Sequence, residues 1–219
     1  MPTTIAVTGH AEERIAPELA AVTLSVGGSG AARDDVVART STAHQRLLAA
    51  VRELEASGAL DTWSAPQLRV SSHRPWNAEG RQLPLVHEAS ADVEVVFRDL
   101  SLLGEWLGTA ADADELTIGG VDWRLTEATR RGAQEAAQRG AVADAVAKAG
   151  VYASALGLGT PAIVELSDHG LLQAQPSPMP KAMLMRTTAD LGGGATTEFA
   201  PRDLVIEASV DARFVADAA

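Results

Sequence analysis

Four side chains in this sequence could carry acid–base or metal chemistry: His73, His87 and the adjacent pair Asp168 and His169. An imidazole titrates near neutral pH, and a carboxylate beside it can orient the ring for proton transfer. None of the five histidines has the H-x-x-x-H or H-E-x-x-H spacing of a zinc helix. No serine near Asp168 lies in a nucleophile elbow such as G-x-S-x-G. We therefore predict no catalytic or metal site, and a hydrolase-like enzyme using these residues remains an alternative.

A small-molecule binding module is a second alternative, and it would need a pocket lined by some of Trp76, Trp106 and Trp123. The glycine-rich residues 27–30 lie between a predicted strand and a predicted helix, where a dinucleotide-binding loop would lie. The G-x-G-x-x-G pattern fails there, and no βαβ unit surrounds the segment. We therefore predict a turn at this position and no bound cofactor.

The elements that would position these residues follow from hydrophobic periodicity. Alternating segments predict strands over residues 4–8, 19–27, 67–73, 84–97, 116–125, 162–167 and 204–214. A hairpin is the simplest link between the first two strands. Apolar stripes at helical spacing predict helices over 32–56, 99–111 and 126–156, the last rich in alanine. We expect an α+β fold: antiparallel sheets with a helix after the first hairpin, a short helix, and one long alanine-rich helix packed on the sheet.

Three of these elements have specific consequences for the candidate residues. A turn over residues 75–84 would form a hairpin that brings His73 and His87 toward each other. His44 lies on the apolar stripe of the first helix, which is typical of a partly buried, hydrogen-bonded structural histidine. The last strand places Asp211 among the polar residues of its second face, which predicts that this face is solvated.

The chain of 219 residues is long enough for one domain with a full core. We predict a single domain, with a division into two lobes over about residues 1–97 and 98–219 as the alternative. Residues 170–202 contain four prolines and three consecutive glycines, which predicts a long flexible loop. Exposed apolar residues in such a loop favour an interface, and we predict one that includes the following residues: Met179, Met183, Leu184 and Met185.

The charge balance excludes some partners. The formal net charge is −11, and the basic residues form no cluster, so we expect no nucleic-acid partner. No apolar run approaches the roughly 20 residues that span a bilayer, so we expect no membrane insertion. The first residues lack the basic start and apolar core of a signal peptide, which predicts a cytoplasmic protein. The sequence contains no cysteine, which excludes disulfides and thiolate ligands.

Several strings, taken in order, resemble the SIMPL-domain family, a bacterial group of largely unknown function. They are IAVTG at residues 5–9, AAVTLSV at 20–26, the extended segment 86–97, IGGV at 118–121 and ALGLG at 155–159. The resemblance covers residues 5 to about 214 and implies no established catalytic residues. It implies a link to oxidative-stress defence for some relatives, export for many, and large ring-like or channel-like homo-oligomers for others. Together with the apolar loop, it predicts a non-enzymatic, self-associating scaffold or interaction protein whose small-molecule ligand is unknown.

Overall fold

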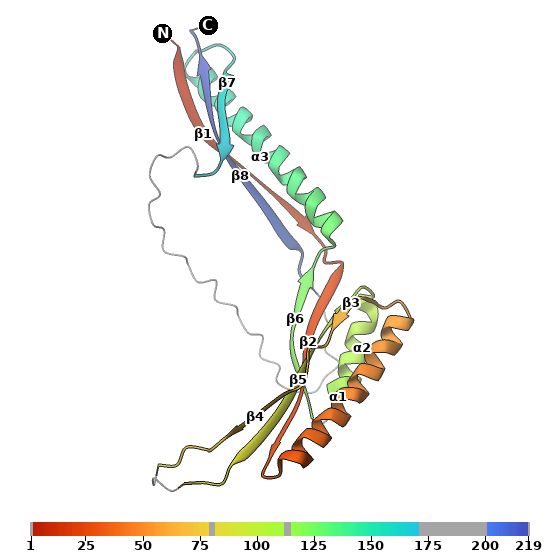
Figure 1. Ribbon diagram of the computed structural model, residues 1–219. Helices are drawn as coiled ribbons and strands as arrows, with labels where there is room; N and C mark the ends of the chain where they lie inside the picture. The colour runs from red at the N-terminus through yellow and green to blue at the C-terminus, as the bar shows by residue number, and fades with distance from the viewer. Residues whose placement is uncertain (1, 79–81, 112–114, 171–200, 219) are drawn as a thin grey trace. The chain divides into compact units, whose positions relative to one another are not determined.

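The computed structural model describes residues 2–78, 82–111, 115–170 and 201–218 (Figure 1). These residues form two compact units, which we describe separately. Unit 1 contains residues 2–16, 126–170 and 203–218, and unit 2 contains the described residues of 17–125 together with 201–202. The division therefore falls after residues 16 and 125, and Phe97 lies inside unit 2.

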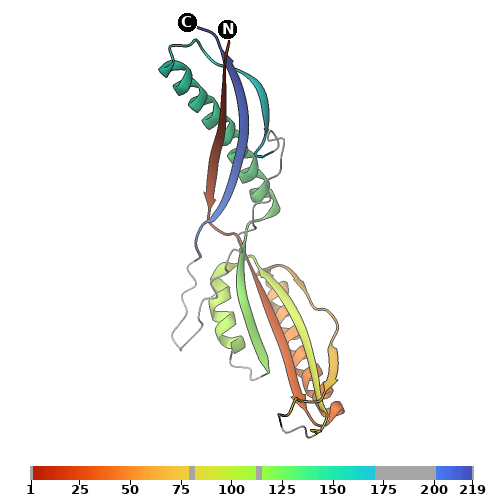
Figure 2. The ribbon, with the colours of Figure 1, turned by 90° about the vertical axis from the view of Figure 1, so that its left-hand side faces the viewer.

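Unit 1 is a three-stranded antiparallel sheet with one helix on it. The sheet order is β1-β8-β7, and the three strands lie side by side in both views (Figures 1 and 2). The helix α3 packs against β1 and β8, and its contacts with β7 are few. The bounds of these elements are β1 Thr3–Ile15, α3 Glu127–Ala155, β7 Ala162–Asp168 and β8 Leu204–Ala216.

The predicted hairpin between the first two strands is wrong, because β1 pairs with β8 and β2 belongs to the other sheet. The β1–β8 ladder runs without a break from Thr3 opposite Ala216 to Ile15 opposite Leu204. Both strands are longer than predicted, since β1 continues through the charged residues 12–14, where apolar alternation weakens. Alternation reveals the two faces of a strand but carries no information about its partner.

The alanine-rich helix allows the close backbone approach that its small residues predict. Its buried residues recur every four positions, at Ala133, Ala137, Ala141, Ala145, Ala149 and Ala153. Under this stripe lies Gly9 of β1, where an added Cβ would stand 2.0 Å from the Ala141 carbonyl oxygen. A glycine is therefore required at this crossing of strand and helix. Thr126 is the N-cap of the helix, since its side-chain oxygen accepts a hydrogen bond from the Thr129 N–H.

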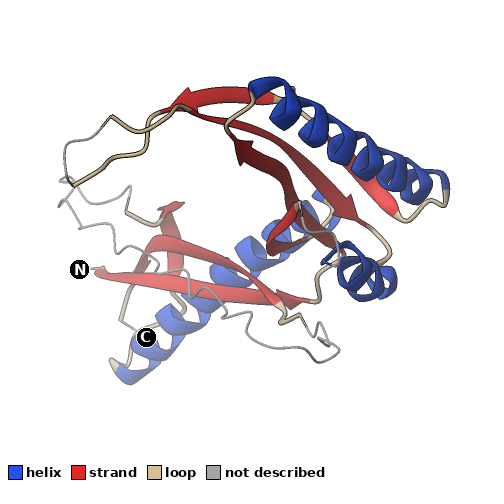
Figure 3. Ribbon diagram, turned by 90° about the horizontal axis from the view of Figure 1, so that it is seen from below, coloured by secondary structure: helices blue, strands red, loops and turns tan. Residues whose placement is uncertain are grey.

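Unit 2 is an antiparallel sheet of five strands with two helices on one face (Figure 3). The sheet order is β3-β5-β2-β6, and β4 also pairs with β5. One core cluster joins alternate residues of β2 and β5 to apolar residues of both helices, such as Leu47, Val51 and Leu103. The bounds are β2 Leu19–Gly30, α1 Arg33–Ala56, β3 Leu60–Ser64, β4 Arg69–His73, β5 Val86–Phe97, α2 Leu100–Ala111 and β6 Leu116–Arg124.

Both units are α+β, as predicted, with the three expected helices packed on antiparallel sheets. Asp99 caps the short helix α2, since its Oδ1 accepts a hydrogen bond from the Ser101 N–H at 3.0 Å. The short strand β3 has no counterpart in the sequence prediction, because only two of its five residues, Leu60 and Trp63, are partly buried. No helix among the described residues is long and apolar enough to span a membrane.

Candidate functional site

His73 and His87 lie on paired strands but do not form a common site. In the β4–β5 ladder Ser72 stands opposite His87, and His73 stands opposite Val86. Neighbouring residues of a strand point to opposite faces, so the two imidazoles are on different faces of the ribbon. Accordingly, His87 Nδ1 lies 2.7 Å from Ser72 Oγ, and His73 Nδ1 lies 3.7 Å from Glu88 Oε1.

The second candidate pair is in unit 1, where His169 contacts Asp211 rather than its sequence neighbour Asp168. His169 Nδ1 lies 3.0 Å from Asp211 Oδ1, so this nitrogen must carry the proton that the carboxylate accepts. The same carboxylate accepts hydrogen bonds from Thr8 Oγ1 at 2.8 Å and from the Gly170 N–H at 2.9 Å. Three donors, one from β1 and two from the residues after β7, therefore converge on Asp211.

Asp211 is the one charged side chain that is buried among the described residues, with 9% of its surface exposed. The hydrogen bonds from Gly170 and His169, and then from Thr8, lower the pKa of this carboxyl to about 2. The sequence prediction placed Asp211 on a solvated face. That prediction is wrong for this residue, because the three donors enclose a position that alternation alone leaves open to water.

A second hydrogen-bonded pair lies beside Asp211 on the same face of the sheet. His10 Nδ1 is 2.8 Å from Ser209 Oγ, and the rings of His10 and His169 have centroids 6.5 Å apart. The serine thus contacts one histidine and the aspartate contacts the other. A Ser-His-Asp relay needs a single imidazole between both partners, and the hydrogen bonds of the described residues do not supply it.

The metal-binding capacity of these clusters is low. Among residues 2–78, 82–111, 115–170 and 201–218, no group of three or more His, Asp or Glu side chains is arranged to hold a metal ion. Two nitrogen or oxygen ligands make a weak site for a transition metal. The Asp211 cluster is therefore best explained as a structural anchor that joins β1, β8 and the residues after β7.

His44 is half buried on α1, as predicted, but the hydrogen bond expected for it is not seen. Its Nε2 atom and the Oγ1 atom of Thr40, one turn earlier, are buried without a hydrogen-bond partner among the described residues. Thr40 Oγ1 lies over β2, 3.7 Å from the position of an added Cβ at Gly28.

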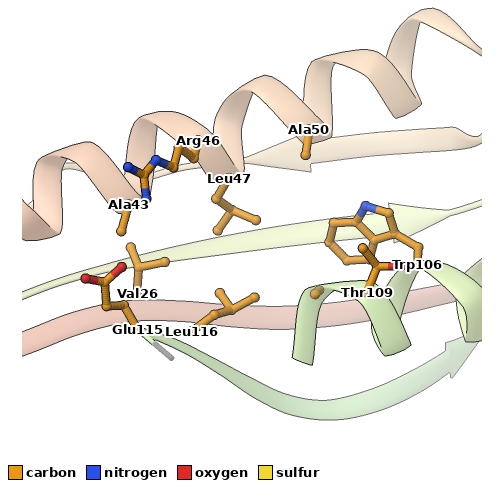
Figure 4. A pocket seen from close by; sticks show the side chains of 10 residues that line it. Val26, Ala43, Arg46, Leu47, Ala50, Trp106, Thr109, Glu115 and Leu116 are labelled. Carbon is orange, nitrogen blue, oxygen red and sulfur yellow. The ribbon is translucent and has the colours of Figure 1, made fainter. Parts of the chain in front are cut away.

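Unit 2 contains a cavity of about 230 Å³ between the two helices and the sheet (Figure 4). Its walls are mainly apolar: Leu47 of α1, Trp106 of α2, Val26 of β2 and Leu116 of β6. Space remains there because α1 and α2 present alanines to each other at three lining positions, Ala43, Ala50 and Ala110. Of the tryptophans proposed to line a pocket, the cavity includes Trp106.

The two edge strands of the unit 1 sheet, β1 and β7, differ in whether side chains of α3 bond to their backbone. On the β1 edge, Lys148 Nζ donates to the Thr8 carbonyl at 2.9 Å, and Asp144 Oδ2 accepts from the His10 N–H at 2.8 Å. These two α3 residues satisfy backbone groups that would otherwise offer a pairing site. No such contact from α3 reaches β7 among the described residues.

The β7 edge is apolar and open. Ile163 and Leu166 stand opposite Phe214 and Ala212, which are buried beneath α3, yet each is 48% exposed. Val146 is also 48% exposed, and it lies on the flank of α3 turned away from β1. We call the three exposed aliphatic residues of this strand, Ile163, Val164 and Leu166, the β7 surface.

The predicted interface residues Met179, Met183, Leu184 and Met185 lie outside the described residues, as does most of the predicted loop over 170–202. The β7 surface escaped the sequence prediction because alternation marks apolar residues as inward-facing. A signal was present in the run Ala162-Ile163-Val164, where three apolar residues follow one another and cannot all face one core.

Comparison with known families finds a match over residues 5–214 to the family described as SIMPL, protein of unknown function (DUF541). A comparison with curated proteins finds no match.

Proposed function

The chain belongs to the SIMPL family, and from that premise we propose that it is a non-enzymatic, self-associating scaffold protein whose copies meet at the β7 surface of unit 1. The observation that carries the proposal is the contrast between the two edges of the unit 1 sheet. Side chains of α3 cover the β1 edge, whereas the β7 edge presents three exposed aliphatic residues, Ile163, Val164 and Leu166, within four positions of one short strand. Such surfaces are typical of interfaces.

The distribution of apolar residues supports the same region. Twelve large hydrophobic side chains of the described residues are exposed, and eight of them belong to unit 1. The eight are Val146, Val151, Tyr152, Leu156, Ile163, Val164, Leu166 and Val205. Unit 1 has a narrow core made largely of alanine, so burial against a second copy would add the apolar contact that its own core lacks.

A second copy of the chain is the partner that fits this surface. Two identical apolar patches can meet across a two-fold axis, which is the commonest symmetry of soluble oligomers. The interface has to bury about 800 Å² on each partner to be specific. The homo-oligomers that the family resemblance implies agree with this assignment. We propose that any role in oxidative stress proceeds without thiol chemistry, because the sequence contains no cysteine.

The test is the mass of the purified protein by light scattering over a range of concentrations. We expect a discrete oligomer, which higher salt strengthens because copies carrying a net charge of −11 repel one another at low ionic strength. The double variant Ile163→Lys/Leu166→Lys should be a monomer, since it places charge on exposed positions without touching the core.

The matched control is Val70→Lys/Leu85→Lys, which changes two similarly exposed residues of unit 2. It should leave the oligomer intact. A wild-type protein that is a monomer at every concentration would refute self-association. An oligomer that survives the β7 double variant would refute the assignment of the surface.

A further inference from the structure

We propose that the cavity of unit 2 is a binding site for a free amino acid with a large apolar side chain, held by its two charged groups at one end and by Trp106 at the other. The cavity lies wholly within unit 2, so this inference does not depend on the β7 surface.

The size of the cavity selects the size of the ligand. A cavity of about 150 Å³ holds benzene, and drug-sized molecules occupy about 300–1,000 Å³. At about 230 Å³ the cavity lies between these limits. It therefore suits a molecule of one ring or one branched chain with a small polar group.

One end of the cavity is apolar and the other end carries charged side chains. At one end the indole of Trp106 lies with Ala50 and Leu47 beside it, which provides an apolar environment (Figure 4). At the other end Arg46, Glu115 and Ala43 line the cavity (Figure 4). A ligand that fills the cavity must therefore be amphipathic, with its polar group directed to Arg46 and Glu115.

The two charges specify the polar group. Arg46 comes from α1 and Glu115 immediately precedes β6, so one cation and one anion reach the same mouth from different elements. Neither side chain forms an ion pair with another described residue. An α-amino acid carries a carboxylate and an ammonium on one carbon, and it can therefore satisfy Arg46 and Glu115 together. A simple carboxylic acid or a simple amine would leave one of them without a partner.

The experiment uses L-phenylalanine as the probe, and compares it with 3-phenylpropanoate, which lacks the ammonium, and 2-phenylethylamine, which lacks the carboxylate. Binding is followed on the full chain through the indole N–H signals in two-dimensional NMR. The Trp106 signal is identified by its loss in Trp106→Phe. Trp76, which is 86% exposed and does not line the cavity, provides an internal reference.

We expect L-phenylalanine to shift the Trp106 signal with saturation below about 10 mM, and each single-charge analogue to bind at least about tenfold more weakly. Arg46→Gln should abolish the advantage of L-phenylalanine over the amine, and Glu115→Gln its advantage over the acid. Both residues are exposed at the mouth, so these variants leave the core unchanged.

The matched pair of cavity variants is Ala50→Leu and Ala49→Leu on the same helix. Ala50 lines the cavity and Ala49 is exposed to solvent, so the first should remove binding and the second should not. Far-UV circular dichroism checks that Ala50→Leu is folded, and the analogue series tests the proposal in the wild-type chain if it is not. A Trp106 signal unmoved by about 10 mM L-phenylalanine would overturn the proposal, and so would equal binding of all three probes.

Discussion

Replacing Gly9 by alanine should destabilise unit 1 selectively, because Gly9 is the point at which β1 and α3 touch backbone to backbone. The new Cβ would lie 2.0 Å from the Ala141 carbonyl oxygen and 2.7 Å from the Ala145 nitrogen. Ordinary van der Waals contact begins near 3.4 Å, so the helix must retreat by about 1.4 Å. No side chain can rotate away to relieve the overlap, since the obstructing atoms are backbone atoms.

The expected loss of stability follows from the contacts that weaken when α3 moves away from β1. Overpacking a well-packed site costs about 1–3 kcal/mol. A gap of 0.5–1 Å already forfeits a quarter to a half of each dispersion contact, and the alanine stripe supplies five of the eleven buried residues in the core of unit 1. Against this, the lower chain entropy of alanine in the unfolded state returns about 0.4–1 kcal/mol. We expect a net loss of about 2 kcal/mol, which is severe for a unit with so small a core.

The assay separates the two units by their chromophores. All four tryptophans belong to unit 2, so their fluorescence reports on unit 2 alone, whereas far-UV circular dichroism reports on the helices and sheets of both units. In urea, Gly9→Ala should shift the dichroism transition of unit 1 to lower concentration and leave the tryptophan fluorescence transition unchanged.

The control is Gly28→Ala in β2, where the nearest atom to the new Cβ is Thr40 Oγ1 at 3.7 Å. This variant should be neutral or slightly stabilising by the same entropic argument. If Gly9→Ala is as stable as Gly28→Ala, the close crossing of β1 and α3 is not a feature of the protein in solution.

Two further predictions concern the anchors of unit 1. Because the folded pKa of Asp211 is about 2 and its ordinary value is 3.8, its ionised form should stabilise unit 1 above about pH 4 by about 1–2 kcal/mol, and this contribution should be lost as the pH falls toward 2. Urea titrations between pH 2 and 6 should show this dependence in the wild type and a flatter one in Asp211→Asn; equal pH dependence in both would contradict the assignment. Thr126→Ala removes the N-cap of α3 and should cost about 1 kcal/mol in the dichroism transition, whereas Thr42→Ala, in the middle of α1, should cost less; equal losses would argue against capping.

The helices were predictable to within one residue at each end. Their signals are local: a stripe of apolar residues at helical spacing, a capping side chain such as Thr126 or Asp99, and a glycine shortly after the last turn of α3. All the strands except β3 were predictable as elements but not as partners, because the first two do not form a hairpin and β1 instead pairs with a strand some 200 residues later. The same holds for the candidate sites: the sequence identified His169, but its hydrogen-bond partner is Asp211 and not the adjacent Asp168.

The sequence by itself therefore determined the secondary structure of most segments, the apolar face that each presents, the small-residue stripe of α3, and the family that matches residues 5–214. The exceptions are β3, which was not predicted, and residues 27–30, where a turn was predicted but β2 continues to Gly30. These properties depend on residues a few positions apart, which constrain one another directly. Only the tertiary structure decided which strands pair and which side chains contact one another. The enclosure of Asp211, the uncovered β7 surface and the cavity between α1 and α2 all arise from residues distant in sequence, and pairing across such distances is set by the packing of the whole unit rather than by local preference.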